Sequence, residues 1–261
     1  MRLGREQVLR ELELLPMWKL KQAALQTKAV PQVAAEPASV ALASVTEALP
    51  EASALPSIME PSSEDRNASI AQMDWQALQS CVSHCEACVL SQTRTQTVFG
   101  VGNPNAEWMF IGEAPGMEED QQGVPFVGQA GHLLDNMLRA MALQRGQNVY
   151  ISNILKCRPP ENRDPHRGEI TQCAPYLQRQ VALIKPRLII ALGRVAAQSL
   201  LNTQENVAAL RGKQHVYQDV PVIVTYHPAY LLRNLPDKAK AWDDLCYANS
   251  VMQGLKSGVS S

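Results

Sequence analysis

Short apolar runs alternate along the chain with longer segments in which apolar residues recur every three or four positions. The runs are residues 108–112, 149–154, 188–193 and 220–225, and the periodic segments are residues 130–142, 166–184, 194–201 and 238–255. A short apolar run predicts a buried strand, and a period of three to four predicts an amphipathic helix. Strands that alternate with helices predict an α/β fold with three layers, in which helices cover both faces of a central four-stranded parallel sheet.

Small, polar and turn-forming residues lie at the end of each predicted strand. The sequence Gly-Glu-Ala-Pro-Gly begins at Gly112, Asn153 lies within the end of the second strand, Gly193 and Arg194 follow the third, and His227 follows the fourth. In open parallel sheets, ligands bind beyond the carboxyl ends of the strands. The pattern therefore predicts a functional site at one edge of the sheet.

The N-terminal part of the chain differs in composition from the rest. Within residues 1–28, apolar residues recur at helical spacing, which predicts an amphipathic helix. Residues 29–70 are rich in Ala, Pro and Ser and contain no aromatic residue, which predicts a flexible linker. Residues 71–261 are then the folded domain.

The helix predicted within residues 1–28 has two interpretations. Residues 9–20 read LRELELLPMWKL and resemble the N-terminal peptide of the psi subunit of the bacterial clamp loader, which implies docking on a replication protein. A helix that docks on the chain's own folded domain fits the same pattern equally well.

Composition limits the cellular setting but says little about partners. With 261 residues and 46% hydrophobic content, the chain is long enough for one substantial core. It has no apolar run of about 20 residues and no hydrophobic segment after its first residues, so we expect a cytoplasmic protein without a membrane span. The formal net charge of −1 neither predicts nor excludes a nucleic-acid partner, because the charges are unevenly distributed.

Four of the six cysteines form a pattern typical of a metal site. Cys85 and Cys88 form a C-x-x-C motif, and Cys157 and Cys173 follow further along the chain. Thiols stay reduced in the cytosol, so a metal is a better explanation than disulfides. Spacing alone leaves zinc and an iron–sulfur cluster open, because both bind four thiolates. Cys81 and Cys246 are interpreted as ordinary small residues.

A set of short motifs, taken in their order along the chain, carries a family resemblance. The motifs are CEAC (85–88), GEAPGMEED (112–120), GVPFVGQAG (123–131), YISNILKCRPPENRDP (150–165), Cys173, ALGR (191–194) and YHPAYLLR (226–233). Residues 81–245 thereby resemble the family 4 uracil-DNA glycosylases of bacteria and archaea. The resemblance implies a monomeric DNA repair enzyme that flips uracil out of DNA and hydrolyses its glycosidic bond, leaving an abasic site. It also implies that Cys85, Cys88, Cys157 and Cys173 hold a [4Fe–4S] cluster.

The same resemblance assigns residues to the uracil pocket. Phe126 stacks on the flipped base. The amide of Asn153 matches the N3–H donor and the O4 acceptor of uracil and mismatches cytosine. His227 donates a hydrogen bond to O2 of the leaving anion.

Further pocket residues come from the loop after the first strand. Gly112, Glu113 and Ala114 lie against the base, and Glu119 excludes thymine. Glu113 positions the attacking water, although uracil glycosylases of another family carry Asp one place later, where this chain has Ala114. Three roles for Glu113 thus stay open: a general base, electrostatic support for the sugar cation, or a plain loop residue. For the acidic residues 118–120, the alternative is a solvated helix start.

Contacts to DNA are expected from two segments. Leu231 enters the minor groove as a wedge and Arg233 binds phosphate. Arg158 and Arg163, together with Lys156 and Arg167, form a second basic stretch that contacts the DNA backbone. A solvated charged loop is the alternative interpretation of this stretch.

Two other functions compete with base excision. The first is a non-catalytic iron–sulfur module of the same fold that binds DNA or the replication machinery. The second is an electron-transfer protein that uses the cluster, and it predicts no dependence on Asn153 or His227.

Overall fold

The computed structural model describes residues 63–258. The amphipathic helix predicted at residues 1–28 and most of the predicted linker lie outside the described residues. The chain divides into two units, residues 1–57 and 58–261, and the described residues all belong to the second.

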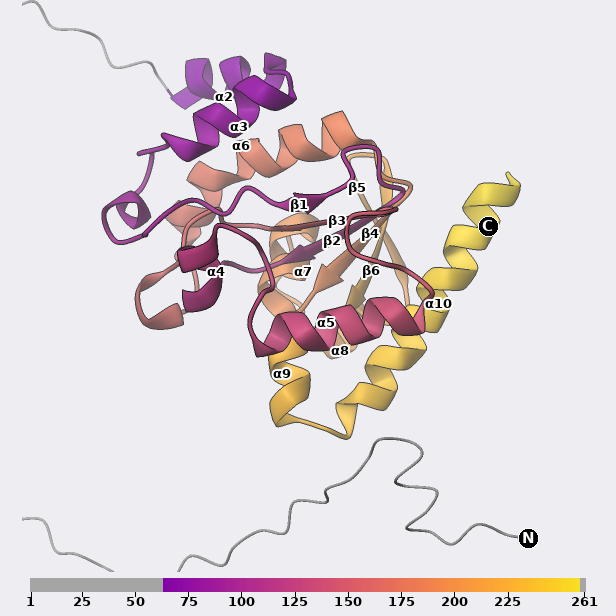
Figure 1. The fold of residues 1–261 in the computed structure, drawn as a ribbon. Helices are drawn as coiled ribbons and strands as arrows, with labels where there is room; N and C mark the ends of the chain where they lie inside the picture. The colour runs from indigo at the N-terminus through magenta and orange to yellow at the C-terminus, as the bar shows by residue number, and fades with distance from the viewer. Residues whose placement is uncertain (1–62, 259–261) are drawn as a thin grey trace, which may run out of the picture. The chain divides into compact units, whose positions relative to one another are not determined.

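The core of this unit is a six-stranded sheet in the order β1-β3-β2-β4-β6-β5 (Figure 1). The strands are β1 (Val101–Gly102), β2 (Trp108–Gly112), β3 (Val149–Asn153), β4 (Leu188–Leu192), β5 (Gln214–Tyr217) and β6 (Val220–Thr225). The four predicted strands are confirmed as β2, β3, β4 and β6, which are mutually parallel. The short edge strands β1 and β5 are antiparallel to their neighbours and were not predicted.

Strand register aligns the functional ends of the parallel strands. Gly112 of β2 is paired with Asn153 of β3, and Leu192 of β4 is paired with Thr225 of β6. The loops that follow these strands therefore leave the sheet along the same edge, as the sequence predicts.

Helices fill the connections between the strands. They are α2 (Ser63–Gln72), α3 (Trp75–Ser83), η1 (Val89–Gln92), α4 (Met117–Gln122), α5 (Gln129–Ala140), η2 (Pro160–Asn162), α6 (Arg167–Ile184), α7 (Arg194–Leu201), α8 (Val207–Leu210), α9 (Pro228–Arg233) and α10 (Asp237–Ser257). The four predicted helices are confirmed as α5, α6, α7 and α10, with ends shifted by at most two residues.

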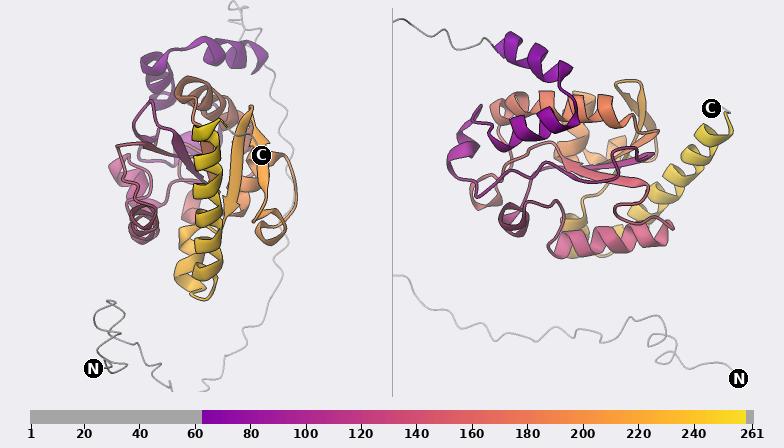
Figure 2. Two further views of the ribbon diagram at one scale, coloured as in Figure 1. Left: turned by 90° about the vertical axis from the view of Figure 1, so that its right-hand side faces the viewer. Right: turned by 45° about the horizontal axis from the view of Figure 1, so that its top comes forward.

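Two apolar layers enclose the sheet, because successive strand residues point to opposite faces. Met109 and Ile189 pack in the cluster that contains residues of α6, α7 and α8. Phe110 and Ile190 pack in the cluster that contains residues of α5 and α10. Figure 1 shows α6 above the sheet and α5 below it, and the turned views of Figure 2 keep the sheet between these layers. The predicted three-layer α/β/α fold is confirmed.

A third apolar cluster lies where α2 and α3 pack on α6. Ile70 of α2 is 1% exposed in this cluster. The prediction that the flexible linker extends to residue 70 is therefore wrong, because residues 63–70 belong to a helix that packs on the domain. No helix in residues 63–258 is long and apolar enough to span a bilayer.

Candidate functional site

A cleft of about 770 Å³ lies at the sheet edge where the parallel strands end. Its walls come from the segments after β2, β3, β4 and β6 and from the loop between α4 and α5. Among the lining residues are Glu113, Phe126, Asn153, Arg194 and His227. The structure thus places the main residues predicted for the pocket around one cavity.

Asn153 presents an unpaired acceptor to this cleft. The residue is 2% exposed, and its side-chain Oδ1 has no hydrogen-bond partner among residues 63–258. Leaving a buried polar atom unpaired costs about 1–3 kcal/mol, so such an atom indicates a ligand that donates to it.

Gly112 makes this arrangement possible through its missing side chain. A Cβ atom at Gly112 would lie 2.5 Å from Asn153 Oδ1 and 2.5 Å from Phe126 Cζ. Real Cβ atoms do not approach other atoms this closely, so a larger residue would displace the amide or the ring.

His227 is held as a neutral imidazole. Its Nδ1 accepts a hydrogen bond of 3.1 Å from the backbone N–H of Ala229, which caps α9. Burial, aided by the charge of Arg233, lowers the pKa of His227 to about 4. With Nδ1 acting as acceptor, the single proton of the neutral ring sits on Nε2, which can donate to a ligand.

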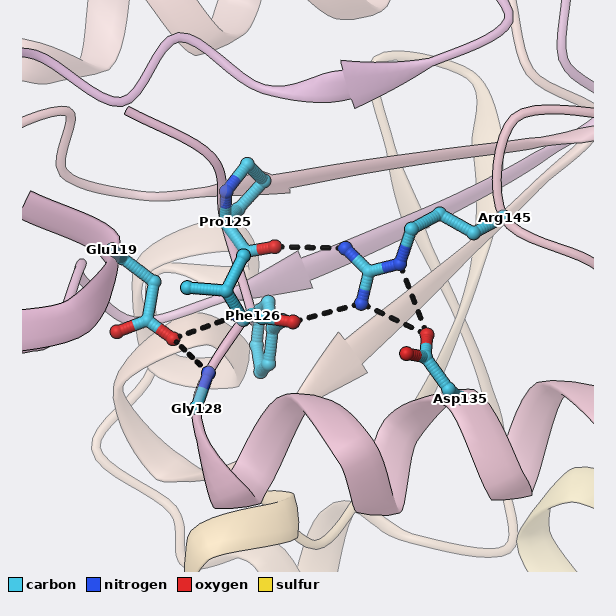
Figure 3. Close-up of polar contacts among 7 residues, drawn as sticks. Glu119, Pro125, Phe126, Gly128, Asp135 and Arg145 are labelled. Carbon is cyan, nitrogen blue, oxygen red and sulfur yellow. Dashed lines mark hydrogen bonds and ion pairs between the residues drawn. The ribbon is translucent and has the colours of Figure 1, made fainter. Parts of the chain in front are cut away.

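Phe126 lines the cleft next to His227. Its side chain is 6% exposed, and its ring centroid lies 5.5 Å from that of His227. The backbone has a φ of 56°, in the left-handed region that bulky residues rarely adopt. Figure 3 shows the polar groups that surround this backbone.

Glu113 supplies an acidic group at the cleft. Burial and, secondarily, the nearby charge of Asp164 raise the pKa of Glu113 to about 7, while Arg194 acts in the opposite direction. Asp164 and Arg194 form an ion pair with each other. A carboxyl group with a pKa near 7 is suited to proton transfer at neutral pH.

The four motif cysteines lie together in the third apolar cluster, with Cys157 and Cys173 buried and Cys85 and Cys88 partly buried. Hydrogen-bond donors approach three of the sulfurs. Arg66 Nη2 lies 3.9 Å from Cys85 Sγ, Arg94 Nη1 lies 3.2 Å from Cys157 Sγ, and the N–H of Lys156 lies 3.3 Å from Cys173 Sγ.

Such donors suit the negatively charged thiolates that a cluster would require. Across residues 63–258, however, no three His, Cys, Asp or Glu side chains are arranged to hold a metal ion. Metal binding by these cysteines therefore stays a prediction.

Comparison with known proteins identifies the family. Residues 99–246, more than half of the chain, match the sequence profile of the Uracil DNA glycosylase superfamily. The chain belongs to this superfamily.

Several type-4 uracil-DNA glycosylases are similar to this superfamily member. The enzyme from Sulfurisphaera tokodaii is 47% identical over 162 residues, which cover 59% of this chain and 73% of the relative. The enzyme from Archaeoglobus fulgidus is 46% identical over 58% of this chain and 79% of its own length. The enzyme from Thermotoga maritima is 43% identical over 59% of this chain and 80% of its own length.

Within this uracil-DNA glycosylase fold, two residues predicted to contact DNA are placed differently from the expectation. Leu231 is 1% exposed, so its side chain is not available as a wedge in this conformation, whereas Leu232 is 40% exposed. Lys156 is also 1% exposed, and its Nζ donates to Ser152, Asn153 and Gln180 at 2.6–2.9 Å. Lys156 is therefore an internal residue and not a phosphate ligand.

The arginines predicted to bind DNA differ in availability. Arg233 is exposed at the mouth of the cleft. Arg158 donates to Asn162 at 2.7 Å. Both terminal nitrogens of Arg163 donate hydrogen bonds to the buried carboxylate of Glu169. Of the remaining cysteines, Cys81 lies in the third cluster and Cys246 is exposed.

Three polar residues that shape the pocket have roles that sequence analysis missed. Glu119 accepts from the backbone N–H groups of Gly116, Val127 and Gly128. Arg145, paired with Asp135, donates to the backbone next to Phe126. The glutamate three residues after the N-cap Gly116 was the available signal for the first, because such a side chain reaches back to the N-cap amide; nothing in the sequence pattern marks the second pair.

Proposed function

We propose that this protein is a DNA repair glycosylase that flips uracil out of DNA and hydrolyses its N-glycosidic bond, leaving an abasic site. The observation that carries the proposal is the unpaired Asn153 Oδ1 in a cleft that Phe126 and His227 also line. The type-4 uracil-DNA glycosylases with 42–47% identity support it.

Base selection follows from the amide of Asn153. Uracil offers an N3–H donor for the unpaired Oδ1 and an O4 acceptor for the amide nitrogen. Cytosine offers an acceptor at N3 and a donor amino group at C4, so both bonds are lost and Oδ1 stays unpaired. The loss of two buried bonds discriminates strongly between the bases.

Departure of the base is assisted by His227. As the glycosidic bond breaks, negative charge develops on the uracil ring and its O2 becomes a better acceptor. The Nε2–H of the neutral imidazole, held in place by its Nδ1 bond to Ala229, donates to this oxygen. Phe126 stacks on the base and keeps it within reach.

Glu113 acts on the sugar side of the bond. In its ionised form the carboxylate orients the attacking water, accepts its proton and stabilises the oxocarbenium-like sugar. The backbone of Gly112 and Ala114 lies against the base in this arrangement. Glu119, fixed by three backbone amides, forms the wall that excludes thymine.

DNA is held around the mouth of the cleft. Arg233 binds a phosphate and Arg158 contacts the backbone from the neighbouring loop, whereas Arg163, whose terminal nitrogens donate to Glu169, orders that loop. Leu232, the exposed leucine of α9, takes the place in the duplex left by the flipped nucleotide.

The four motif cysteines hold a [4Fe–4S] cluster in this proposal. The cluster supplies structural support and no redox step, since hydrolysis of the glycosidic bond transfers no electrons. A brown colour with a broad visible absorption band in freshly purified protein supports the cluster, and a colourless zinc-containing protein contradicts it.

We also propose a cellular setting for this enzyme. The enzyme is a monomer that works on the chromosome in the cytoplasm of a bacterium, and residues 1–28 link it to a replication protein. Removal of residues 1–28 should leave excision from oligonucleotides intact and abolish co-purification with the replication machinery.

Release of free uracil from a uracil-containing oligonucleotide tests the proposed activity. The wild-type protein should release uracil, and Asn153→Ala should lose at least about a hundredfold in rate. Asn136→Ala, at an exposed position of α5, is the matched control and should be fully active. DNA binding without base release would favour the non-catalytic module, and cluster reduction with no dependence on Asn153 would favour electron transfer.

A further inference from the structure

We propose that Arg145, held by Asp135, is a positioning residue that locks the backbone of Phe126 so that its ring stays in the base pocket. The inference rests on the proposed function, because it assigns a cause to the placement of the stacking ring. It starts from the left-handed φ of 56° at Phe126. A bulky residue does not keep this conformation unless its surroundings impose it.

Arg145 imposes the conformation from the carbonyl side. Its Nη1 donates to Pro125 O at 2.8 Å, and its Nη2 donates to Phe126 O at 2.8 Å (Figure 3). The two carbonyls flank the φ and ψ torsions of Phe126. A planar guanidinium that binds both at once fixes their relative orientation, which a single donor cannot do.

Asp135 fixes the guanidinium in turn. Its Oδ1 lies 3.0 Å from Arg145 Nε and 2.9 Å from Nη2, and Asp135 belongs to the rigid helix α5. The chain from α5 through Asp135 and Arg145 therefore anchors the Phe126 loop to the domain core.

The opposite side of the same loop is held by its amides. Glu119 Oε1 accepts from Val127 N at 2.9 Å and from Gly128 N at 3.1 Å. At Gly131 a Cβ atom would lie 1.9 Å from Phe126 O, so only glycine lets the carbonyl approach α5. The peptides on both sides of Phe126 are thus held in a narrow range of orientations.

Arg145 and Asp135 act on the ligand only through this loop. Glu119, Phe126 and Asn153 line the cleft, whereas neither Arg145 nor Asp135 is among its lining residues in the described part of the chain. Arg145 is only 23% exposed in its side chain and has its donors engaged, so a role on DNA phosphate is not available to it. Its loss should therefore resemble a displaced Phe126.

The test measures base capture and excision separately in the full-length protein. The probe is a duplex with 2-aminopurine beside the uracil, whose fluorescence rises when the uracil leaves the stack. Arg145→Met should reduce the fluorescence amplitude and lower the single-turnover excision rate by about tenfold to a hundredfold. Arg145→Lys, with one point donor, should restore part of the rate, and Arg139→Met, at an exposed position of α5, should match wild type.

A double-mutant cycle with Phe126→Ala decides whether the effect passes through the ring. If it does, Arg145→Met changes the rate of Phe126→Ala by less than about twofold. Independent, multiplying effects overturn the proposal, as does an Arg145→Met protein that is folded but excises at the wild-type rate. If Arg145→Met does not fold, Asp135→Asn is measured in the same cycle with the same two outcomes. Absence of uracil release by wild type instead refutes the proposed function.

Discussion

The ring of Phe126 lies 5.5 Å from the ring of His227, with 31° between their planes. The two residues come from different parts of the chain, the loop before α5 and the segment after β6. Both rings line the cleft, so a flat ligand stacked on Phe126 lies next to His227. In the proposed reaction, stacking by Phe126 and hydrogen bonding by His227 then act on the same base.

The pH dependence of excision should follow the ionisation of Glu113. Because the pKa of this carboxyl is raised to about 7, the active carboxylate form increases as the pH passes through that value. His227, with a pKa lowered to about 4, stays neutral over the same range and adds no second transition to the pH–rate profile. Single-turnover rates between about pH 5 and pH 9 should rise to a plateau above about pH 8.

Glu113→Gln should abolish this pH dependence, and Glu205→Gln, at an exposed position, should leave it unchanged. Glu113→Gln should also change the stability of the protein. Folded Glu113 binds its proton more tightly than the unfolded chain does, so the free energy of unfolding falls as the pH rises from about 4.5 to about 7. Above that range Glu113→Gln should be more stable than wild type by about 3 kcal/mol. A variant less stable at pH 8 would contradict the raised pKa.

The two nitrogens of His227 can be separated by substitution. Asn at this position keeps an acceptor for the Ala229 N–H and loses the donor at Nε2, whereas Ala loses both. His227→Asn should therefore lower the excision rate by about a hundredfold to a thousandfold with little change in melting temperature. His227→Ala should lose the same rate and, in addition, about 1 kcal/mol of stability. Equal melting temperatures with unequal rates would argue against this division of roles.

Gly112→Ala should inactivate the pocket without unfolding the protein. The added methyl group would lie 2.5 Å from Asn153 Oδ1 and from the Phe126 ring, so one of the two must move. Gly168→Ala, at a helical position with no atom within 4 Å of the added Cβ, is the matched control. Uracil release and circular dichroism of both variants check this. An active Gly112→Ala would show that Asn153 or the Phe126 ring can shift without loss of function.

Loss of a proposed cluster ligand should affect folding before chemistry. Cys157 is buried within the segment that follows Asn153, so Cys157→Ala should lose visible absorption, melt at lower temperature and lose activity in parallel. Cys81→Ala should keep both the absorption and the activity. A stable, colourless and active Cys157→Ala would refute the structural role.

The sequence predicts the sheet core well because buried parallel strands are continuous apolar runs and their covering helices are periodic. The edge strands β1 and β5 could not be predicted in this way. Val101–Gly102 is too short to show a period, and Gln214–Tyr217 is a polar strand whose residues are half-buried at most.

The site was predictable where a residue type alone carries the chemistry. Asn153 in a buried strand and His227 at a strand end are of this kind. The exposure of the two leucines of α9 was not, because one residue along a helix turns a side chain by about 100°. How α9 packs on α5 decides that Leu231 is inside and Leu232 outside. Likewise, Arg145 reaches Phe126 only through the folded loop.

The unpaired Oδ1 of Asn153 has a consequence for the end of each turnover. An acceptor that only a ligand satisfies holds the released base as readily as the attached one, so free uracil should inhibit the enzyme competitively. Binding to the folded state alone also raises the melting temperature, by an amount that grows with the concentration of uracil. Cytosine, which places an acceptor against the same oxygen, should do neither. Release of uracil from the pocket should then limit the turnover rate as much as its capture does.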